Sequence, residues 1–326
     1  MKFDEIEAAA LRLNGHARVT PMLTSPFLDR IAGRRVLVKA EALQKTGSFK
    51  YRGARSALSA MNPDIRRHGV IAYSSGNHAQ GVALASSEFG VPAVIVMPVD
   101  APAVKVANTR ALGAEVILYD RALDDRDQIG ARIAEERGLT LIKPFDDPMV
   151  IAGQGTTGLE IAEQAAAEGV SRADVLVCCG GGGLTSGIAL ALEARAPGLR
   201  ARPVEPEGFD DVARSLRLGR IDRNTLPGGS LCDAIVTPAP GQITVPIMQR
   251  LCGPGLAVSD DEALRAMAAA FARLRIVLEP GGAVALAAAL YRPEASDGDA
   301  VVVVASGGNV DWPVFRRAVD TWGDGG

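Results

Sequence analysis

From residue 70 onward, short apolar stretches alternate along the chain with longer amphipathic ones. Apolar runs of strand length occupy 70–75, 91–98, 114–120 and 139–145. Between them the apolar positions change to a helical spacing, at 81–90, 104–113 and 124–138. The strand-length runs are apolar on both faces, as a parallel sheet covered by helices on both sides requires. The pattern therefore predicts an α/β fold.

A second series of the same kind begins near residue 150. It comprises helices at 156–169, 185–196, 261–277 and 281–291, and strands at 173–179, 201–206 and 299–306. We find no internal repeat, low-complexity tract or linker, and Pro and Gly residues mark turns between elements. Two lobes packed on one another are therefore expected. Chain order predicts a large domain from 1–68 and 147–326, with a small domain of 69–146 inserted in it.

Composition narrows the class of protein. The 326 residues are 48% hydrophobic and 22% charged, with a formal net charge of −3, which is typical of a soluble globular protein. No basic run or stripe is present, so neither nucleic acid nor a membrane surface is an expected partner. The N-terminus is acidic, without the regions of a signal peptide, so a cytoplasmic location is expected. The four cysteines lack a disulfide or metal spacing and are expected to be buried thiols.

Two glycine-rich stretches differ in what they predict. Residues 178–187, CCGGGGLTSG, follow a predicted strand and precede a helix. Such a turn exposes backbone N–H groups at a helix N-terminus and predicts a phosphate site; a flexible loop is the alternative. Residues 153–158, GQGTTG, match a dinucleotide-binding pattern, but Asp174 begins the next strand instead of ending it. We therefore predict a tight helix start there.

Three further turns carry candidate side chains. In SSGNHAQG, residues 74–81, Ser74, Ser75, Asn77 and nearby amides are suited to hold a carboxylate. His78 is either a polar residue at the helix start or a substrate contact. Ser306, in SGGNVD, follows a predicted strand and would face a ligand there. Lys50, in KTGSFKYRGA, is either a surface charge or a reactive amine, and these ten residues do not decide between the two.

Five motifs together identify a family. SFKYRGA, SSGNHAQG, CGGGGL, EPGG and SGGNVD follow one another across nearly the whole chain. In this order they resemble the serine/threonine dehydratase family of fold type II pyridoxal-phosphate enzymes, which includes serine racemase and 3-hydroxyaspartate ammonia-lyase. The resemblance implies the fold of the tryptophan synthase β subunit, with two open twisted α/β lobes and the cofactor, pyridoxal 5'-phosphate, between them.

The resemblance also implies roles for individual residues. Lys50 would form the Schiff base with the cofactor, and Phe49 and Ala234 would flank its ring. Asn77 would contact the ring hydroxyl and Ser306 the ring nitrogen. The phosphate would be held by Gly180, Gly181, Gly182, Gly183 and Leu184. The implied reaction releases a 2-oxo acid and ammonia from a β-hydroxy amino acid, with Lys50 removing the α proton.

The substrate residues implied by the family leave alternatives open. The substrate carboxylate would bind Ser74, Ser75, Gly76, Asn77 and His78. Ser75 matches the acid/base of the racemases, although a simple carboxylate contact is the alternative. Arg126 matches an arginine that binds a second carboxylate, or it is a helix surface charge. Threonine or serine is the expected substrate, with 3-hydroxyaspartate as a competitor. Phe145, in place of the racemase asparagine, argues against racemisation as the main activity.

The family resemblance also extends to a cation and to assembly. Glu205, Asp211 and the carbonyl of Phe209, in VEPEGFDD, resemble a site for Mg²⁺ or Ca²⁺, and a solvated acidic turn is the alternative. A homodimer is the expected assembly, and a small amino acid the expected substrate. The rival interpretation from another class is a phosphate- or nucleotide-binding module without pyridoxal phosphate.

Overall fold

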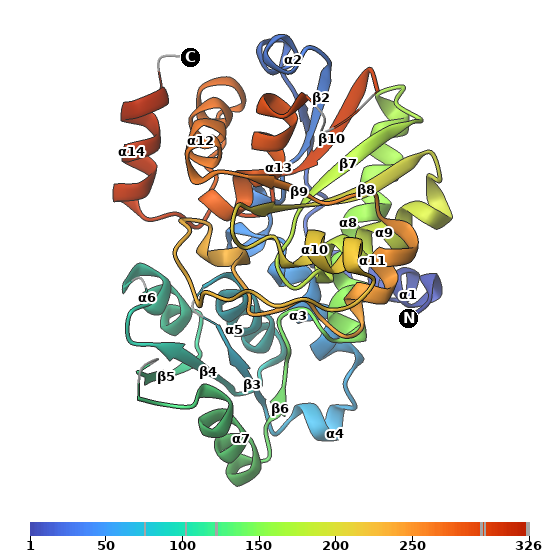
Figure 1. The fold of residues 1–326 in the computed structure, drawn as a ribbon. Helices are drawn as coiled ribbons and strands as arrows, with labels where there is room; N and C mark the ends of the chain where they lie inside the picture. Colours follow the sequence, from blue (N-terminus) through green and yellow to red (C-terminus); the bar gives the residue numbers. More distant parts are fainter. Residues whose placement is uncertain (75, 102, 121–122, 294–295, 297, 324–326) are drawn as a thin grey trace.

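The strands form two separate sheets (Figure 1). The computed structural model describes residues 1–74, 76–101, 103–120, 123–293, 296 and 298–323. The larger sheet has six strands, in the order β1 (Met22–Thr24), β2 (Arg35–Lys39), β10 (Ala300–Val304), β7 (Ala173–Cys178), β8 (Leu199–Pro206) and β9 (Leu256–Val258). The smaller sheet has four, in the order β5 (Glu115–Tyr119), β4 (Ala93–Pro98), β3 (Val70–Tyr73) and β6 (Thr140–Leu141). Neighbouring strands are parallel except β1, which runs antiparallel to β2.

Helices cover both faces of both sheets. The α-helices that the structure describes are α1 (Phe3–Leu13), α2 (Pro26–Ala32), α3 (Lys50–Ala60), α4 (Pro63–Arg66), α5 (Asn77–Phe89), α6 (Ala103–Ala111), α7 (Arg126–Arg137), α8 (Pro148–Ala167), α9 (Gly183–Arg195), α10 (Asp211–Leu218), α11 (Thr244–Leu251), α12 (Asp260–Leu274), α13 (Pro280–Tyr291) and α14 (Trp312–Trp322). The short 3₁₀ helices η1 (Glu41–Leu43), η2 (Lys45–Gly47) and η3 (Asp233–Ile235) lie in connections. The predicted α/β class is confirmed.

The pleat of the six-stranded sheet divides its core in two. In β10, Val301 and Val303 pack with α13, while Val302 and Val304 pack on the other face with α8 and α9. Successive side chains of a strand point to opposite faces, so a strand buried on both must be apolar throughout. This requirement explains the uninterrupted apolar runs in the sequence.

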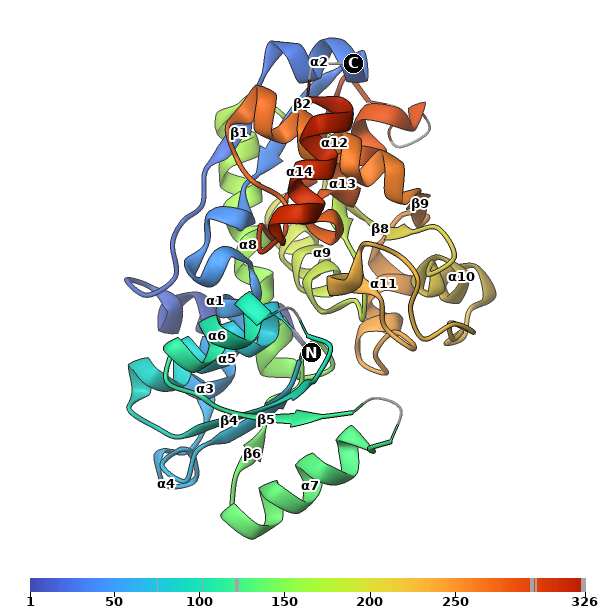
Figure 2. The ribbon, with the colours of Figure 1, turned by 90° about the vertical axis from the view of Figure 1, so that its left-hand side faces the viewer.

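The four-stranded sheet has its own apolar clusters. Helices α5 and α6 lie on the face toward the six-stranded sheet, and α7 lies on the opposite face (Figures 1 and 2). The cluster beneath α5 also contains Tyr51, Ala54 and Leu58 of α3. Helix α3 therefore packs with this sheet, although the predicted boundary at residue 68 assigns it to the large domain.

Residues 153–158 correct one expectation. The GQGTTG stretch lies inside α8, which begins at Pro148 behind the N-cap Asp147, so the predicted helix start was wrong by several residues. Its glycines allow close helix contacts. A Cβ on Gly155 would lie 3.0 Å from the carbonyl oxygen of Gly187 in α9, and one on Gly153 only 2.5 Å from that of Arg52 in α3. Tertiary packing therefore outweighs the low helix propensity of glycine.

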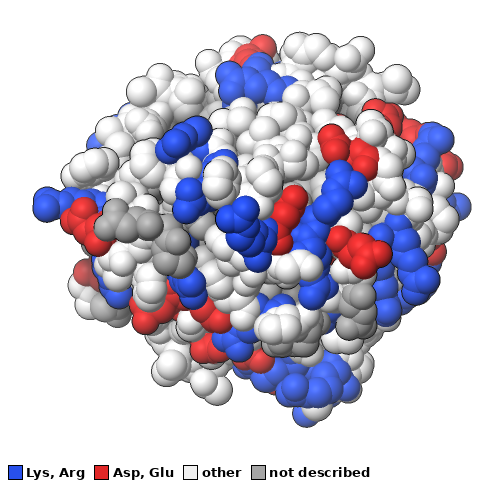
Figure 3. All heavy atoms as spheres, turned by 90° about the horizontal axis from the view of Figure 1, so that it is seen from above, with Lys and Arg blue, Asp and Glu red and all other residues white. Residues whose placement is uncertain are grey.

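Other expectations from composition can be compared with the structure. All four cysteines are free and buried, as predicted. In the described part of the chain, no helix has the length and apolar character needed to cross a membrane. On the face drawn in Figure 3, acidic and basic side chains are intermixed and form no stripe of one sign.

A buried ion network fixes α3 against α8. The guanidinium of Arg52, with only 1% of the side chain exposed, donates to Glu41 at 2.8 Å and to Glu160 at 2.6 Å. Lys39, fully buried, reaches Glu160 at 2.5 Å and the carbonyl of Thr20 at 2.7 Å. The opposite charges offset the cost of removing each group from water. Loss of one member would leave its partners buried with an uncompensated charge.

We predict that Arg52→Ala strongly destabilises the protein. Loss of the guanidinium leaves the buried Glu41 carboxylate without its main partner and Glu160 with only Lys39 of its two cationic partners, which costs about 3–5 kcal/mol in the free energy of unfolding. Urea unfolding measures this change. Arg35→Ala is the matched control, because the Arg35–Glu168 pair is about half exposed and its loss should cost about 1 kcal/mol or less. Equal losses for both variants would contradict the prediction.

Candidate active site

The carboxyl ends of strands from both sheets surround one cavity of about 830 Å³. Ser74 follows β3, Cys179 follows β7 and Ser306 follows β10, and all three line the wall. The starts of α3, α5 and α9 complete it. Ligands of open α/β sheets bind at the carboxyl ends of the strands. A cavity of this volume is large enough for a cofactor together with a small substrate.

Lys50 is the first residue of α3 and lines the cavity. Its Nζ donates a hydrogen bond to the carbonyl oxygen of Pro144 at 2.9 Å. Burial lowers the pKa of the Lys50 amine to about 8, and the carboxylate of Glu279 opposes this shift. About a tenth of such amines are uncharged at pH 7. Lys50 therefore lies in the cavity wall and is not a surface charge, and its lowered pKa is the property expected of a reactive amine.

The glycine turn connects β7 to α9. Gly182 has a φ of +90°, a conformation that side chains strongly disfavour. None of the hydrogen bonds between described residues uses an N–H group of Gly180, Gly181, Gly182, Gly183, Leu184 or Thr185. The hydroxyl of Thr185 is buried without an oxygen or nitrogen partner among the same residues. The turn thus offers unused donors at a helix N-terminus, which suits an anion.

Phe145 packs against this turn. A Cβ on Gly181 would lie 2.2 Å from the Phe145 ring, and one on Gly183 would lie 3.0 Å from its backbone. The glycines are therefore required for the close approach of Phe145 as well as for the exposed amides.

Asn77 and Glu279 form a short polar chain at the cavity wall. Asn77 Nδ2 donates to Glu279 Oε1 at 2.5 Å, and Asn77 Oδ1 accepts from Asn309 Nδ2 at 2.7 Å. These bonds fix the orientation of the Asn77 amide. Burial raises the pKa of Glu279 to about 7, with Lys105 and Asn77 opposing the shift. Glu279 belongs to the EPGG motif, but the sequence analysis gave it no role.

The other residues predicted to contact the cofactor lie in the same wall. Ser306 is buried, and its carbonyl oxygen accepts from the backbone N–H of Phe49 at 3.2 Å, next to Lys50. Ala234 lies on η3, and Phe49 and Leu184 also line the cavity. The structure therefore brings every described residue of the predicted cofactor set to one cavity.

The predicted carboxylate cradle lies at the start of α5. Ser74, Gly76 and Asn77 line the cavity there, whereas Ser75 lies outside the described residues. His78 Nε2 donates to the carbonyl oxygen of Ile142 at 2.9 Å, and burial lowers the pKa of His78 to about 3. His78 is thus a neutral residue with a backbone partner at a helix start, and it also lines the cavity.

Arg126 begins α7 and reaches the cavity from the smaller sheet. Its side chain is 45% exposed and pairs with Asp127 at 3.1 Å. Its guanidinium lies 5.5 Å from the centre of the Tyr73 ring, which lines the same cavity. Both interpretations of Arg126 therefore have a structural basis: it is a paired helix charge, and it faces the site.

The acidic turn after β8 lies apart from this cavity. Glu205 is fully buried, and its two oxygens accept from the N–H groups of Val212 and Ala213 at 2.8 and 2.7 Å. Asp211 Oδ1 accepts from Asn224, while Oδ2 is buried without a described partner. Burial raises the pKa of Glu205 well above its usual range and that of Asp211 to about 6. No cluster of three or more His, Cys, Asp or Glu residues arranged for a metal occurs in the described ranges.

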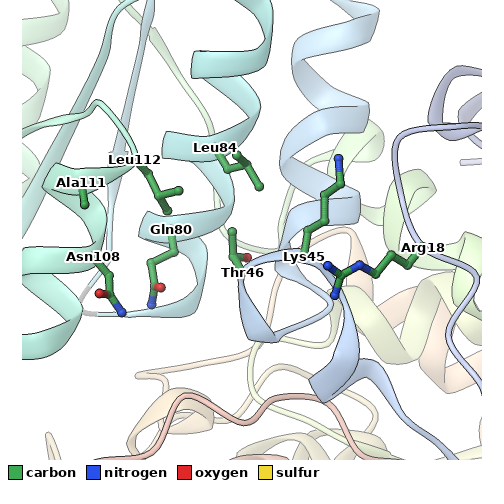
Figure 4. Close-up of a pocket in the computed structure, with 8 residues that line it drawn as sticks. All are labelled: Arg18, Lys45, Thr46, Gln80, Leu84, Asn108, Ala111 and Leu112. Atoms are coloured by element: carbon green, nitrogen blue, oxygen red, sulfur yellow. The ribbon is translucent and has the colours of Figure 1, made fainter.

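A second cavity, of about 390 Å³, lies among η2, α5 and the end of α6 (Figure 4). Both cations among its lining residues already have partners: Lys45 pairs with Glu88 at 2.9 Å, and Arg18 donates to the carbonyl of Leu43 at 2.8 Å. None of the described residues predicted to bind cofactor or substrate lines it.

The chain is similar to known proteins in sequence and in fold. Residues 13–307 match the model of the pyridoxal-phosphate dependent enzyme family. The chain is 44% identical over 310 residues to an L-threo-3-hydroxyaspartate ammonia-lyase from Pseudomonas sp, with 95% of each covered. It is 42% identical to a serine racemase from Schizosaccharomyces pombe, covering 95% of this chain and 94% of that protein. The solved structure of a threonine deaminase from T.th. aligns with a TM-score of 0.90 at 44% identity, over 96% of this chain and 99% of the other.

This chain is a pyridoxal-phosphate-dependent enzyme. The family and the fold type II architecture predicted from the motifs are confirmed. The residues of the cavity also fit the cofactor. The unused amides of residues 180–185 suit its phosphate, and the Lys50 amine, with its lowered pKa, suits its aldehyde.

We predict that capture of pyridoxal phosphate by the apoenzyme speeds up about tenfold from pH 7 to pH 9, because the uncharged Lys50 amine is the nucleophile. Borohydride reduction and mass measurement of the pyridoxyl adduct at Lys50 follow this rate. Glu279→Gln should move the midpoint of the rate's pH dependence to lower pH, since the carboxylate raises the pKa of Lys50. Glu115→Gln, a surface change, should not move it. A midpoint near 10.5, the ordinary value, would contradict the prediction.

Proposed function

We propose that this enzyme is an ammonia-lyase that converts a small β-hydroxy L-amino acid to a 2-oxo acid and ammonia. The observation that carries the proposal is a partly neutral lysine amine in a cavity that also offers unused amides for a phosphate and a helix N-terminus for a carboxylate. The activities named for similar proteins, ammonia-lyase and deaminase, support it.

The residues of the cavity divide the reaction between them. When bound, pyridoxal phosphate supplies an acceptor for the electrons released as the α proton leaves. Lys50 removes this proton with its uncharged amine, and the Pro144 carbonyl orients the amine beforehand. The start of α5 holds the carboxylate, which fixes the Cα near Lys50. Ser306 offers a neutral hydroxyl to the ring nitrogen, and we propose that this weaker electron withdrawal favours β-elimination over transamination.

Three activities are consistent with the site. Threonine or serine needs only the carboxylate cradle and the amine. L-threo-3-hydroxyaspartate carries a second carboxylate, and Arg126 is a cation on the cavity wall that would bind it. Racemisation of serine is the third candidate, but Phe145 against the glycine turn favours elimination over it. The named relatives do not rank these, because their activities differ at nearly equal identity.

We expect 2-oxo acid release from at least one of threonine, serine and L-threo-3-hydroxyaspartate, assayed side by side with the holoenzyme. Arg126→Ala should lower kcat/KM for hydroxyaspartate by about 10- to 100-fold, the range for losing a hydrogen bond to a charged group, and change the other two by less than about threefold. Arg132→Ala, an exposed arginine on the same helix, is the control.

Two results of this assay would count against the proposals. Release of 2-oxo acid from none of the three substrates would refute the lyase. Equal losses on all active substrates in the Arg126 variant would refute its role in selectivity.

We further propose that residues 69–146 move as a small domain toward the six-stranded sheet when substrate binds, which would exclude water during elimination. The separate sheet of β3, β4, β5 and β6 supports this division. The homodimer and the cytoplasmic location expected from the sequence stay predictions.

We propose that Glu205, Asp211 and the carbonyl of Phe209 bind Mg²⁺ or Ca²⁺. Two buried carboxylates in one turn, with Asp211 Oδ2 lacking a described partner, form an oxygen-rich site that suits these cations. The cation would neutralise charges at the start of α10 and stabilise the six-stranded sheet locally, because Glu205 belongs to β8.

Adding Ca²⁺ or Mg²⁺ to chelator-treated protein should therefore raise its unfolding temperature. Saturation at about 100 times the Kd stabilises the folded state by about 2.7 kcal/mol. Differential scanning calorimetry measures the shift. Asp211→Asn should abolish it, and Asp261→Asn, an exposed acidic residue elsewhere, should not. A shift of equal size in the Asp211 variant would place the cation at another site.

A further inference from the structure

Lys105 is a buried cation in the active-site wall that the sequence analysis did not identify. It lies on α6, and its side chain is only 7% exposed. It lines the same cavity as Lys50, Asn77 and Ser306. Figures 1 and 2 show α6 on the side of the four-stranded sheet that faces the six-stranded one. A lysine is rarely buried to this extent unless its charge has a function or a firm partner.

The partner of Lys105 in the structure is a weak one. Its Nζ lies 3.5 Å from Asp233 Oδ2, longer than the roughly 2.7–2.9 Å typical of charged hydrogen bonds. Asp233 is itself 51% exposed, so solvent competes for it. Glu279 also interacts electrostatically with Lys105; its Oε1 accepts from Asn77, and its Oε2 is buried without a hydrogen-bond partner among the described residues. Among the residues that the structure describes, the ammonium therefore has no short charged hydrogen bond.

The ammonium is close to the start of α5, where a carboxylate is expected to bind. A Cβ on Gly76, the N-cap of α5, would lie 3.5 Å from Lys105 Nζ and 3.2 Å from its Cδ. Free N–H groups and the helix dipole attract an anion to this end of the helix. A buried ammonium and a helix N-terminus thus converge on one point of the cavity, and nothing anionic from α5 itself lies in its first turn.

We propose that Lys105 is a substrate-binding residue that completes the carboxylate cradle, and that Asp233 is the counter-ion it leaves when the substrate arrives. The inference rests on the proposed function, since it names how the substrate of that site is held. In the absence of a ligand, Asp233 partly neutralises the ammonium across the gap between α6 and η3. A bound carboxylate makes the shorter, less exposed contact and replaces Asp233.

Lys105 and Arg126 would bind different carboxylates of the substrate. Lys105 lies beside Gly76 and would bind the α-carboxylate, which every amino-acid substrate has. Arg126 begins α7 and would bind only a second carboxylate. Removing Lys105 should therefore weaken the binding of all carboxylates, whereas removing Arg126 should weaken that of dicarboxylates alone.

The test is calorimetric titration of the holoenzyme with two unreactive acids, succinate and butyrate, the second measured by displacement of the first. Lys105→Met should raise the Kd of both by about 10- to 100-fold, as expected for losing a hydrogen bond to a charged group. Lys105→Arg should restore most of the affinity. Asp233→Asn should lower both Kd values about three- to tenfold, because the ammonium is no longer neutralised. The double variant should behave as Lys105→Met does, since Asp233 acts only through Lys105.

Controls separate binding from folding. Lys143→Met and Asp261→Asn remove an exposed charge of each sign outside this cavity and should leave both Kd values unchanged. Unfolding temperature and bound-cofactor absorbance should match those of the unaltered enzyme in every variant compared. If Lys105→Met fails this check, Lys105→Gln in the Asp233→Asn background replaces it.

Four outcomes would overturn the proposal. These are unchanged affinity in Lys105→Met, a loss confined to succinate, weaker binding in Asp233→Asn, and failure of butyrate to displace succinate from the unaltered enzyme. The titrations need no turnover, so they are independent of the lyase assay. An enzyme that released no 2-oxo acid but lost affinity for both acids in Lys105→Met would refute the proposed function and support the role of Lys105.

Discussion

The active site depends on a lysine amine that is partly buried in the cavity wall but not firmly paired with a carboxylate. Burial removes hydration from the charged form and lowers the pKa of Lys50, whereas a close carboxylate would raise it again. The structure resolves this by giving the amine a neutral partner, the carbonyl of Pro144. Glu279, the carboxylate that raises the pKa of Lys50, is directed to Asn77. Lys50 thus keeps a lowered pKa because its hydrogen bond goes to a carbonyl and not to the nearby carboxylate.

The fold also fixes the position of Lys50, because distant parts of the chain meet on both sides of it. The carbonyl of Ser306, after β10, accepts from the N–H of Phe49, so the end of the central strand positions the residue before Lys50. Arg52, two residues after Lys50, is held by Glu41 and Glu160 in the buried network. The first turn of α3 is therefore fixed on both sides of the lysine. Rigid placement of this kind is what allows a side chain to transfer a proton at a defined atom.

The sequence predicted the α/β class and pointed to a set of residues that the structure gathers in one cavity, because both leave local signals. Strands buried on two faces are apolar throughout, and the glycine turn and the lysine motif are short and ordered. Prediction from the sequence failed where the structure of a segment, or the position of a side chain, depends on contacts between distant elements. GQGTTG has poor helix propensity, yet it lies in α8 because α3 and α9 pack there. Lys105 resembles an ordinary surface lysine of a short helix, and only the approach of α6 to η3 shows that it lines the site.

The site separates the groups suited to hold anions from the amine proposed to react. Amides at the start of α9 and α5 are suited to a phosphate and a carboxylate, and amides cannot titrate near neutral pH. If Lys50 itself held either anion, the pairing would raise its pKa and reduce the uncharged fraction that removes a proton. Lys105 extends the same division, because a second amine can supply positive charge for the substrate while Lys50 stays unpaired. The two lysines of the cavity therefore have different roles. Lys105 binds the carboxylate, and Lys50 can remain uncharged because it does not have to do so.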